Sequence, residues 1–257
     1  MSRVLVTGST DGIGRETARQ LLADGHDVVA HARDDERAAD VRAALPGLRD
    51  VVVGDLASLE QTRRLAEAAA DAGPFDAVVH NAGVGGGSGE RQVTVDGLER
   101  IVAVNTVATY LLTALVPRPG RLVYLTSGLE SQGTVQLDDL QWQRRDWDGM
   151  QAYSDSKLHD VVLAFAVARL WPDVHANAVD PGWIRTRMGG PRATDDVADG
   201  AATQVWLATS DDDAARVTGR YLKRFSVLDA NPQASDVGLQ DALLDHLAGL
   251  TGVRLPR

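Results

Sequence analysis

Residues 3–14 read Arg-Val-Leu-Val-Thr-Gly-Ser-Thr-Asp-Gly-Ile-Gly, a short apolar run that passes directly into a glycine-rich turn. The next residues, 12–23, repeat apolar side chains at helical spacing. A glycine turn between a buried strand and a helix N-terminus lets backbone amides approach a pyrophosphate, and the helix dipole favours the negative charge. The segment therefore predicts a strand, a phosphate-binding loop and a helix. The alternative is a tight turn without a ligand, whereas a P-loop is excluded because no Gly-Lys-Ser/Thr follows.

Similar β-branched runs, bounded by Gly, Asp or Asn, recur at residues 27–32, 50–54, 77–80, 121–126 and 174–179. Longer segments rich in Ala, Leu, Arg and Glu lie between them. Continuous apolar strands are buried on both faces, and strands that alternate with helices form a parallel sheet through right-handed crossovers. We therefore expect one doubly wound α/β domain over residues 1–257, ending in a tail, residues 233–257, that contains a helix.

The composition excludes several classes of function. The 257 residues carry 26 Lys plus Arg against 36 Asp plus Glu, a net charge of −10, and contain no cysteine. Disulfides, thiolate metal sites and cysteine nucleophiles are excluded, and the acidic balance argues against nucleic-acid binding. No apolar run approaches the roughly 18 residues that span a bilayer. The six histidines share no metal-ligand spacing. We expect a soluble, cytoplasmic protein without a metal site.

The motif Tyr153-Ser154-Asp155-Ser156-Lys157 is the sharpest chemical signal, because the chain contains only two lysines. Side chains four residues apart share one face of a helix. An ammonium beside a phenol favours phenolate, as an acid/base that works near neutral pH requires. The alternative is an unrelated pair on a solvated helix face.

Polar or glycine residues follow each predicted strand, where a parallel sheet would place a ligand. They are Arg33, Asp55 with Leu56, Asn81 with Ala82 and Gly83, Ser127, and Pro181 with Gly182. Any one of them alone fits an ordinary turn. Together they predict one shared crevice.

From residue 3 to about residue 225 the chain resembles the short-chain dehydrogenase/reductase family, of its classical type. The resemblance rests on TGxxxGxG at residues 7–14, Asn-Ala-Gly at 81–83, Asn105, Ser127, YxxxK and Pro181-Gly182. It implies a Rossmann fold with a parallel, seven-stranded sheet and a catalytic tetrad of Asn105, Ser127, Tyr153 and Lys157. In that family pattern Ser127 holds the substrate oxygen and Tyr153 exchanges a proton with it. Lys157 would bind the nicotinamide ribose, and Asn105 would hold a water.

The resemblance also implies a nicotinamide cofactor. Its expected contacts are Gly8, Ser9, Thr10, Asp11, Gly12, Ile13, Gly14, Arg33, Asp55, Leu56, Asn81, Ala82, Gly83, Tyr153, Lys157, Pro181, Gly182, Ile184 and Thr186. Relatives that prefer NAD place a carboxylate at the position of Ala32, whereas here Arg33 follows, and a guanidinium matches a 2′-phosphate. NADP(H) is therefore preferred, although Asp34 and Asp11 argue the other way and NAD(H) stays open.

Residues 128–149 and 183–195 are the expected substrate-side loops, and the long interval between Ser127 and Tyr153 resembles the retinol-dehydrogenase-like branch. The expected reaction interconverts a carbonyl and an alcohol on a small hydrophobic molecule. Four large side chains either line its pocket or merely anchor the loops: Trp142, Trp147, Trp183 and Met188. The alternative function is a non-catalytic NADP(H)-binding regulator. The family pattern leaves a homodimer, a homotetramer and a monomer open.

Overall fold

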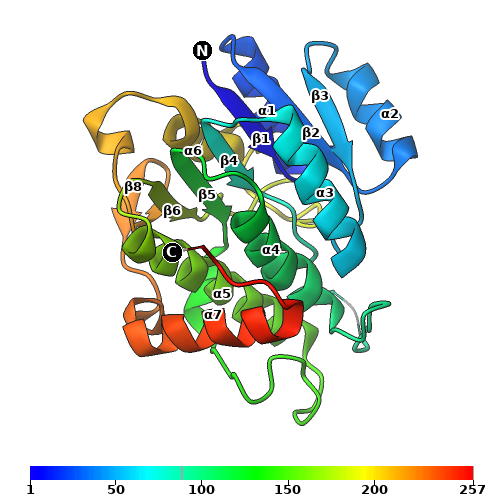
Figure 1. The fold of residues 1–257 in the computed structure, drawn as a ribbon, viewed down its shortest axis with the longest axis vertical. Helices are drawn as coiled ribbons and strands as arrows, with labels where there is room; N and C mark the ends of the chain where they lie inside the picture. The colour runs from blue at the N-terminus through cyan, green and yellow to red at the C-terminus, as the bar shows by residue number, and fades with distance from the viewer. Residues whose placement is uncertain (88, 257) are drawn as a thin grey trace.

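The computed structural model describes residues 1–87 and 89–256. Within them, eight strands form one sheet in the order β3-β2-β1-β4-β5-β6-β7-β8 (Figure 1). The strands are β1 (Arg3–Val6), β2 (Asp27–Ala32), β3 (Asp50–Val53), β4 (Ala77–His80), β5 (Arg121–Leu125), β6 (His175–Val179), β7 (Tyr221–Lys223) and β8 (Ser226–Leu228). The α-helices are α1 (Gly12–Ala23), α2 (Asp35–Ala44), α3 (Leu59–Ala72), α4 (Ala108–Leu115), α5 (Gly149–Leu170), α6 (Val197–Thr209) and α7 (Val237–Thr251).

The doubly wound α/β prediction is confirmed, with one correction to the sheet. Strands β1 to β7 are parallel, but β8 adds an eighth, antiparallel strand beside β7. The two central residues of the hairpin, Arg224 and Phe225, have φ of 47° and 64°. Turns with positive φ at both central residues match the right-handed twist of the flanking strands. The sequence carries no Asn-Gly or Asp-Gly at this turn, so the hairpin gave no recognisable signal.

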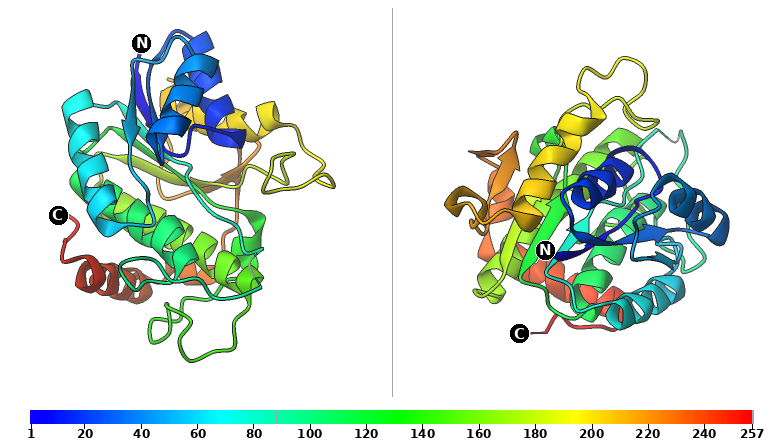
Figure 2. Two further views of the ribbon diagram at one scale, coloured as in Figure 1. Left: turned by 90° about the vertical axis from the view of Figure 1, so that its right-hand side faces the viewer. Right: turned by 90° about the horizontal axis from the view of Figure 1, so that it is seen from above.

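The sheet is buried on both faces because its strands present apolar side chains in both directions. Leu5 points into the core that α3, α4 and α5 cover, while Val4 and Val6 point into the core under α1, α2 and α6 (Figures 1 and 2). Side chains alternate between faces along a strand, so a continuous apolar run fills both layers. Helix α7 lies outside α5 and buries Leu243 and Leu247 completely.

The parallel strands bring the residues that follow β1, β2, β4, β5 and β6 to one edge of the sheet. The helical segment before α4 opens as a π-helical turn, Val102–Val107, which contains Asn105. π-helical turns inside helices occur frequently at functional sites. The connection between β5 and α5 projects from the fold as a long loop after a short 3₁₀ turn, Gly128–Gln132 (Figure 1). None of the helices formed by the described residues is long and apolar enough to cross a membrane.

Candidate active site

The loop between β1 and α1 is built around glycines that no other residue could replace without strain. Gly8 and Gly12 have φ of +65° and +51°, in the left-handed region. A Cβ on Gly14 would lie 2.2 Å from the Gly8 carbonyl oxygen. Asp11 caps α1, since its Oδ1 accepts a hydrogen bond from the Gly12 amide at 2.7 Å. The loop thus has the close-packed form that a backbone cradle for a pyrophosphate requires.

The Asn-Ala-Gly segment after β4 is tied directly to this loop. The Thr7 hydroxyl accepts hydrogen bonds from the amides of Asn81 and Ala82 at 2.9 and 3.0 Å. The Asn81 side-chain amide donates to the carbonyls of Thr7 and Gly8 at 2.8 and 3.2 Å. Two predicted motifs that lie more than 70 residues apart in sequence therefore form one rigid unit.

His31 braces the same loop from β2, a role that the sequence did not reveal. Its Nδ1 accepts a hydrogen bond from the Gly8 amide at 2.9 Å, and its Nε2 lies 2.8 Å from the Gly54 carbonyl oxygen. This pairing requires the neutral ring with the proton on Nε2. Burial lowers the pKa of His31, which keeps the ring neutral. Nothing in the spacing of His31 from the glycines could have signalled this contact.

Arg33 stands at the end of β2 with its side chain 66% exposed. Its Nε donates to Asp34 Oδ2 at 3.0 Å, while Asp34 Oδ1 accepts from the Arg37 amide at 2.8 Å and so caps α2. The Arg37 amide and the Arg33 guanidinium lower the pKa of Asp34. Both oxygens of Asp34 therefore already have donors. At the other side of the crevice, Asp11 faces Arg187 at 3.5 Å.

Tyr153 and Lys157 lie on the face of α5 that packs against the end of β5. Lys157 Nζ donates to the Leu125 carbonyl and to Asp160 Oδ2, both at 2.8 Å, and lies 5.8 Å from the centre of the Tyr153 ring. The Thr126 hydroxyl donates to the Lys157 carbonyl at 2.6 Å. Ser127, the next residue after Thr126, accepts at Oγ from the Leu129 amide at 3.3 Å. The Lys157 side chain therefore lies at the end of β5, which stands two residues before Ser127 in the chain.

Lys157 is charged although it is buried. Burial opposes the charge, but the Asp160 carboxylate and the Tyr153 phenol outweigh it and raise the pKa of Lys157. Burial also raises the pKa of Asp160 to about 6, against the opposing attraction of Lys157. At neutral pH the two groups form an ion pair. Asp160 was not singled out from the sequence, although its spacing of three residues from Lys157 places both side chains on one face of a helix.

Asn105 joins the π-helical turn to the glycine-rich segment after β4. Its Oδ1 accepts from the Val84 amide at 2.8 Å, and its Nδ2 donates to the Val84 carbonyl at 3.1 Å and to Ser156 Oγ at 2.9 Å. A Cβ on Gly83 would lie 3.4 Å from Asn105 Oδ1 and 3.5 Å from Lys157 Nζ. Asn105, Gly83 and Lys157 are therefore neighbours in the structure.

The loop after β6 folds back over the glycine loop. Thr186 approaches Gly12, where an added Cβ would meet its Cγ2 at 3.1 Å. Ile184 is buried, and Gly182 has φ of +99° with its amide donating to Asp180 Oδ1 at 2.9 Å. Asp55 also stands at the sheet edge and accepts from the Ala57 amide, whereas the side chain of Leu56 is buried in the core. The segment after β6 therefore lies against the glycine loop after β1.

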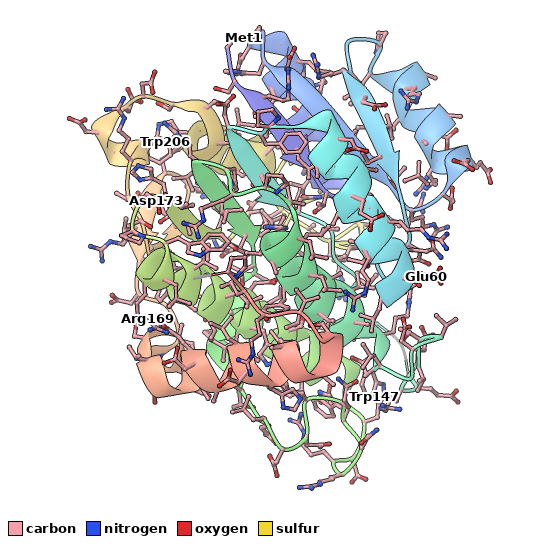
Figure 3. All side chains as sticks on the ribbon, viewed as in Figure 1. Met1, Glu60, Trp147, Arg169, Asp173 and Trp206 are labelled. Carbon is pink, nitrogen blue, oxygen red and sulfur yellow. The ribbon has the colours of Figure 1, made fainter. Side chains whose placement is uncertain are left out.

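Trp142 and Trp147 pack against each other and anchor the long loop. Trp142 is buried, has φ of 52°, and packs with Trp147 at a ring separation of 5.6 Å. Figure 3 labels Trp147 near the loop that projects from the lower part of the fold. The Arg145 guanidinium lies 3.7 Å from the centre of the Trp142 ring and forms ion pairs with Asp139 at 3.1 Å and Asp155 at 3.2 Å. These contacts support the anchoring alternative for both tryptophans. Trp183 and Met188, by contrast, are about half exposed.

Comparison with known sequences identifies the family. Residues 2–196 match the family model described as short chain dehydrogenase. The chain is 38% identical to the short-chain dehydrogenase chyC of Penicillium rubens over the full length of both proteins. It is 36% identical to DnrU of a Streptomyces species, named as a daunorubicin C-13 ketoreductase, covering 97% of this chain and 92% of that one. Human retinol dehydrogenase 13 is 29% identical, over 98% of this chain and 85% of its own length.

Solved structures agree. An uncharacterized protein from Mycobacterium paratuberculosis superposes with a TM-score of 0.86 at 26% identity, over 100% of this chain and 96% of the other. A blue fluorescent protein from a metagenomic library, solved in complex with NADPH, gives a TM-score of 0.67 at 27% identity, over 86% of this chain and 95% of the other. The chain therefore belongs to the short-chain dehydrogenase/reductase family and is an oxidoreductase that acts on CH–OH groups.

Proposed function

We propose that the protein is an NADP(H)-dependent carbonyl reductase/alcohol dehydrogenase in which Tyr153 exchanges a proton with the substrate oxygen. The observation that carries this proposal is the position of Lys157. Its ammonium lies at the end of β5, 5.8 Å from the centre of the Tyr153 ring, and its carbonyl accepts from Thr126, the residue before Ser127. A regulator without chemistry would need neither the phenol nor the buried ammonium. A catalytic function is therefore favoured over a non-catalytic regulator.

The residues present fit a dinucleotide. The cradle at Gly8, Gly12 and Gly14 excludes side chains, and α1 begins there with its backbone amides. The nicotinamide would supply or accept hydride. The loop amides would hold the pyrophosphate, Lys157 the nicotinamide ribose, and Ile184 and Thr186 the far end. Ser127 would orient the substrate oxygen by hydrogen bonding, and Tyr153 would give it a proton during reduction or take one during oxidation.

We propose a preference for NADP(H), based on Arg33 and Asp34. An exposed guanidinium offers a 2′-phosphate two parallel donors and a full charge. The charge of Asp34 is paired with Arg33 and its carboxylate caps α2 through the Arg37 amide, so the carboxylate already has a structural role at this end of β2. The Asp11 carboxylate is partly offset by Arg187.

We propose that the substrate is a ketone or aldehyde on a hydrophobic molecule. Met188 approaches Gly85, where an added Cβ would lie 3.2 Å from its Cγ, and Met150 begins α5 beside Gly86. Trp183, whose ring nitrogen donates to the Gly189 carbonyl next to Met188, and the two methionines each leave about half of their surface exposed. Exposed apolar side chains gathered at one place commonly mark a binding surface. A relative named as a ketoreductase supports reduction as the working direction.

The proposal is tested by NADPH consumption against a panel of hydrophobic aldehydes and ketones, including aromatic methyl ketones. Tyr153→Phe should abolish turnover of the active substrates while NADPH binding, followed by fluorescence, stays nearly intact. Tyr110→Phe is the matched control, because Tyr110 contacts only the C-terminal segment through its hydroxyl. Turnover retained in Tyr153→Phe would remove the phenol from the mechanism.

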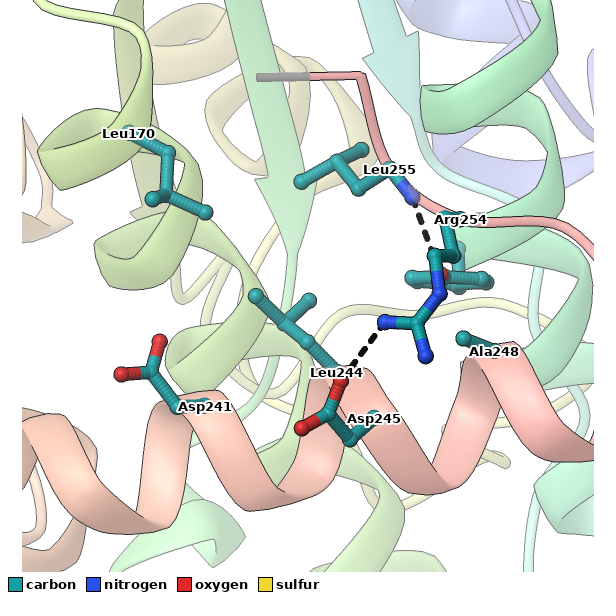
Figure 4. Close-up of a pocket in the computed structure, with 8 residues that line it drawn as sticks. Leu170, Asp241, Leu244, Asp245, Ala248, Arg254 and Leu255 are labelled. Carbon is teal, nitrogen blue, oxygen red and sulfur yellow. Dashed lines mark hydrogen bonds and ion pairs between the residues drawn. The ribbon is translucent and has the colours of Figure 1, made fainter.

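We also propose that the protein is a monomer. Helix α7 packs on the outer side of α5, and the Tyr110 hydroxyl of α4 donates to the Val253 carbonyl at 2.8 Å. Trp171 Nε1 donates to the Pro256 carbonyl at 2.6 Å. A cavity of about 350 Å³ remains between α7, the end of α5 and this tail, bordered by the Arg254–Asp245 ion pair (Figure 4). The C-terminal segment thus covers part of the outer surface of α4 and α5, and light scattering should give the mass of one chain.

A further inference from the structure

Asp160 is a buried acid one turn beyond Lys157 on α5. The two side chains are 4% and 5% exposed, and Asp160 Oδ2 lies 2.8 Å from Lys157 Nζ. Isolating either charge at such a depth would be costly, because the protein interior solvates ions poorly. Each group therefore depends on the other for its ionised form.

The surroundings of the pair contain few other charges. On α5 itself, the Tyr153 phenol acts on Lys157. From β5, the Leu125 carbonyl accepts a hydrogen bond from a second N–H of Lys157, and burial together with the Asp160 charge raises the pKa of the Tyr124 phenol. Beyond Tyr124, the His80 ring stacks on it at 4.9 Å, and burial holds the pKa of His80 at about 3, so this histidine is neutral. Lys157 is the cation that acts on Asp160.

We propose that Asp160 is a positioning residue for the reaction, whose carboxylate holds the Lys157 ammonium charged and fixed at the end of β5. This inference rests on the proposed function, since it assigns Lys157 a role toward the cofactor. In the working site, Lys157 is one half of an ion pair rather than a lone cation.

Two consequences follow from the geometry. Among the described contacts, the Leu125 carbonyl and the Asp160 carboxylate accept hydrogen bonds from two of the three N–H donors of Lys157. These two bonds fix the direction of the third donor, which can then bind a ligand. A buried ammonium without a counter-ion loses its proton easily, because desolvation disfavours the charged form. Asp160 therefore extends the pH range over which Lys157 stays charged.

The test compares wild type with Asp160→Asn, which keeps the shape of the side chain but removes its charge. We would measure NADPH affinity by fluorescence titration and kcat/KM with the best panel substrate, both across the pH range. Near pH 5 the two proteins should agree, because Asp160 in the wild type, with a pKa of about 6, is then protonated as well. At about pH 9, Asp160→Asn should lose about tenfold or more in both quantities.

The matched control is Asp155→Asn, which removes another buried carboxylate of α5 that pairs with Arg145 instead of Lys157. Asp155→Asn should change the size of NADPH affinity and of kcat/KM, but not the pH at which these two quantities decline on the alkaline side. The double variant Lys157→Met with Asp160→Asn removes both charges and should bind NADPH weakly at every pH, without an alkaline decline.

A uniform loss in Asp160→Asn at all pH values, with the alkaline decline unmoved, would overturn the proposal and leave Asp160 a structural role alone. If Asp160→Asn does not fold, Asp160→Glu is measured instead, because it keeps the carboxylate. NADPH affinity that declines at the same alkaline pH as in wild type supports the proposal, and a decline at lower pH refutes it. The NADPH titrations need no turnover. Failure of the whole substrate panel would therefore count against the proposed function while the binding profiles still decide the role of Asp160.

Discussion

Gly14→Ala offers a sharp test of the cofactor loop, because a general rule predicts the opposite outcome. In the body of a helix, alanine is ordinarily about 1 kcal/mol more stable than glycine. Gly14 lies in the first turn of α1 and is buried. A Cβ there would lie 2.2 Å from the Gly8 carbonyl oxygen and 2.3 Å from Asn81 Nδ2, whereas ordinary contact begins at 3.4 Å.

The size of the effect follows from what must move. Either α1 or the Gly8 peptide has to retreat by more than an ångström, and both hydrogen bonds from Asn81 to Thr7 and Gly8 would break. Overpacking costs about 1–3 kcal/mol and two hydrogen bonds about 2 kcal/mol, so after the helix-propensity gain the net loss is about 2–4 kcal/mol. The displaced loop should also bind NADPH at least about tenfold more weakly.

Urea denaturation measures the change in stability, and fluorescence titration measures NADPH binding. Gly249→Ala in α7 is the control, because a Cβ there meets nothing within 4 Å. It should stabilise the protein by about 0.5–1 kcal/mol without affecting the cofactor. A Gly14→Ala protein as stable as wild type, with normal NADPH affinity, would refute the close-packed loop.

Three other changes probe the cofactor preference, the long loop and the buried histidines. Arg33→Ala should weaken NADPH binding by roughly 10- to 100-fold and spare NADH, with Arg42→Ala on α2 as a neutral control; equal loss for both cofactors would exclude a phosphate contact. Arg145→Met should lower the free energy of unfolding by about 3 kcal/mol, because it leaves two buried carboxylates without their ion pair. The control is Arg144→Met at an exposed neighbouring residue, which should change the free energy of unfolding by less than about 0.5 kcal/mol. Similar effects of the two substitutions would contradict the role of Arg145 in anchoring the long loop. Burial holds the pKa values of His80 and His159 at about 3, so the stability that these neutral rings contribute is complete above about pH 6.5 and falls as the pH drops below it, by up to about 1.4 kcal/mol per pH unit for each ring. His80→Gln should reduce that slope by about one proton in pH-dependent denaturation, and an unchanged slope would assign the loss to other groups.

The strands and the first helix could be predicted because their signals are local. Residues 27–32 and 77–80 were predicted with the boundaries that the structure shows, and β1, β3, β5 and β6 differ from their predicted ranges by one residue at an end, whereas no range was predicted for β7. An apolar run bounded by turn formers specifies a buried strand wherever it sits in a parallel sheet. The eighth strand escaped prediction because Ser226–Leu228 is short and exposed, and its turn relies on backbone angles that Arg224 and Phe225 adopt only in the folded hairpin.

The candidate site likewise contains residues that the sequence analysis singled out and residues that it did not. Tyr153 and Lys157 share a helix face by spacing alone, and the glycine positions follow from the turn. His31 had no comparable signal, because its partners come into reach only when β1, β2 and β3 align. Asp160 lies three residues after Lys157, a spacing that puts both side chains on one helix face, but the burial of the pair depends on the packing of α5 against β5.

By itself, the sequence determined the fold class, the family and the chemical groups available, since these depend on periodicity, turn residues and side-chain type, which are local properties. Only the tertiary structure decided the electrostatic state of those groups. Whether Lys157 is a lone ammonium or half of an ion pair, and whether Arg145 contacts solvent or two buried carboxylates, depends on distances of a few ångströms in a water-poor interior. There the energy of a charge is set by its nearest partners and by how deeply they are buried. The spacing of Lys157 and Asp160 places them on one helix face, but neither their burial nor the approach of Asp139 to Arg145 follows from the sequence.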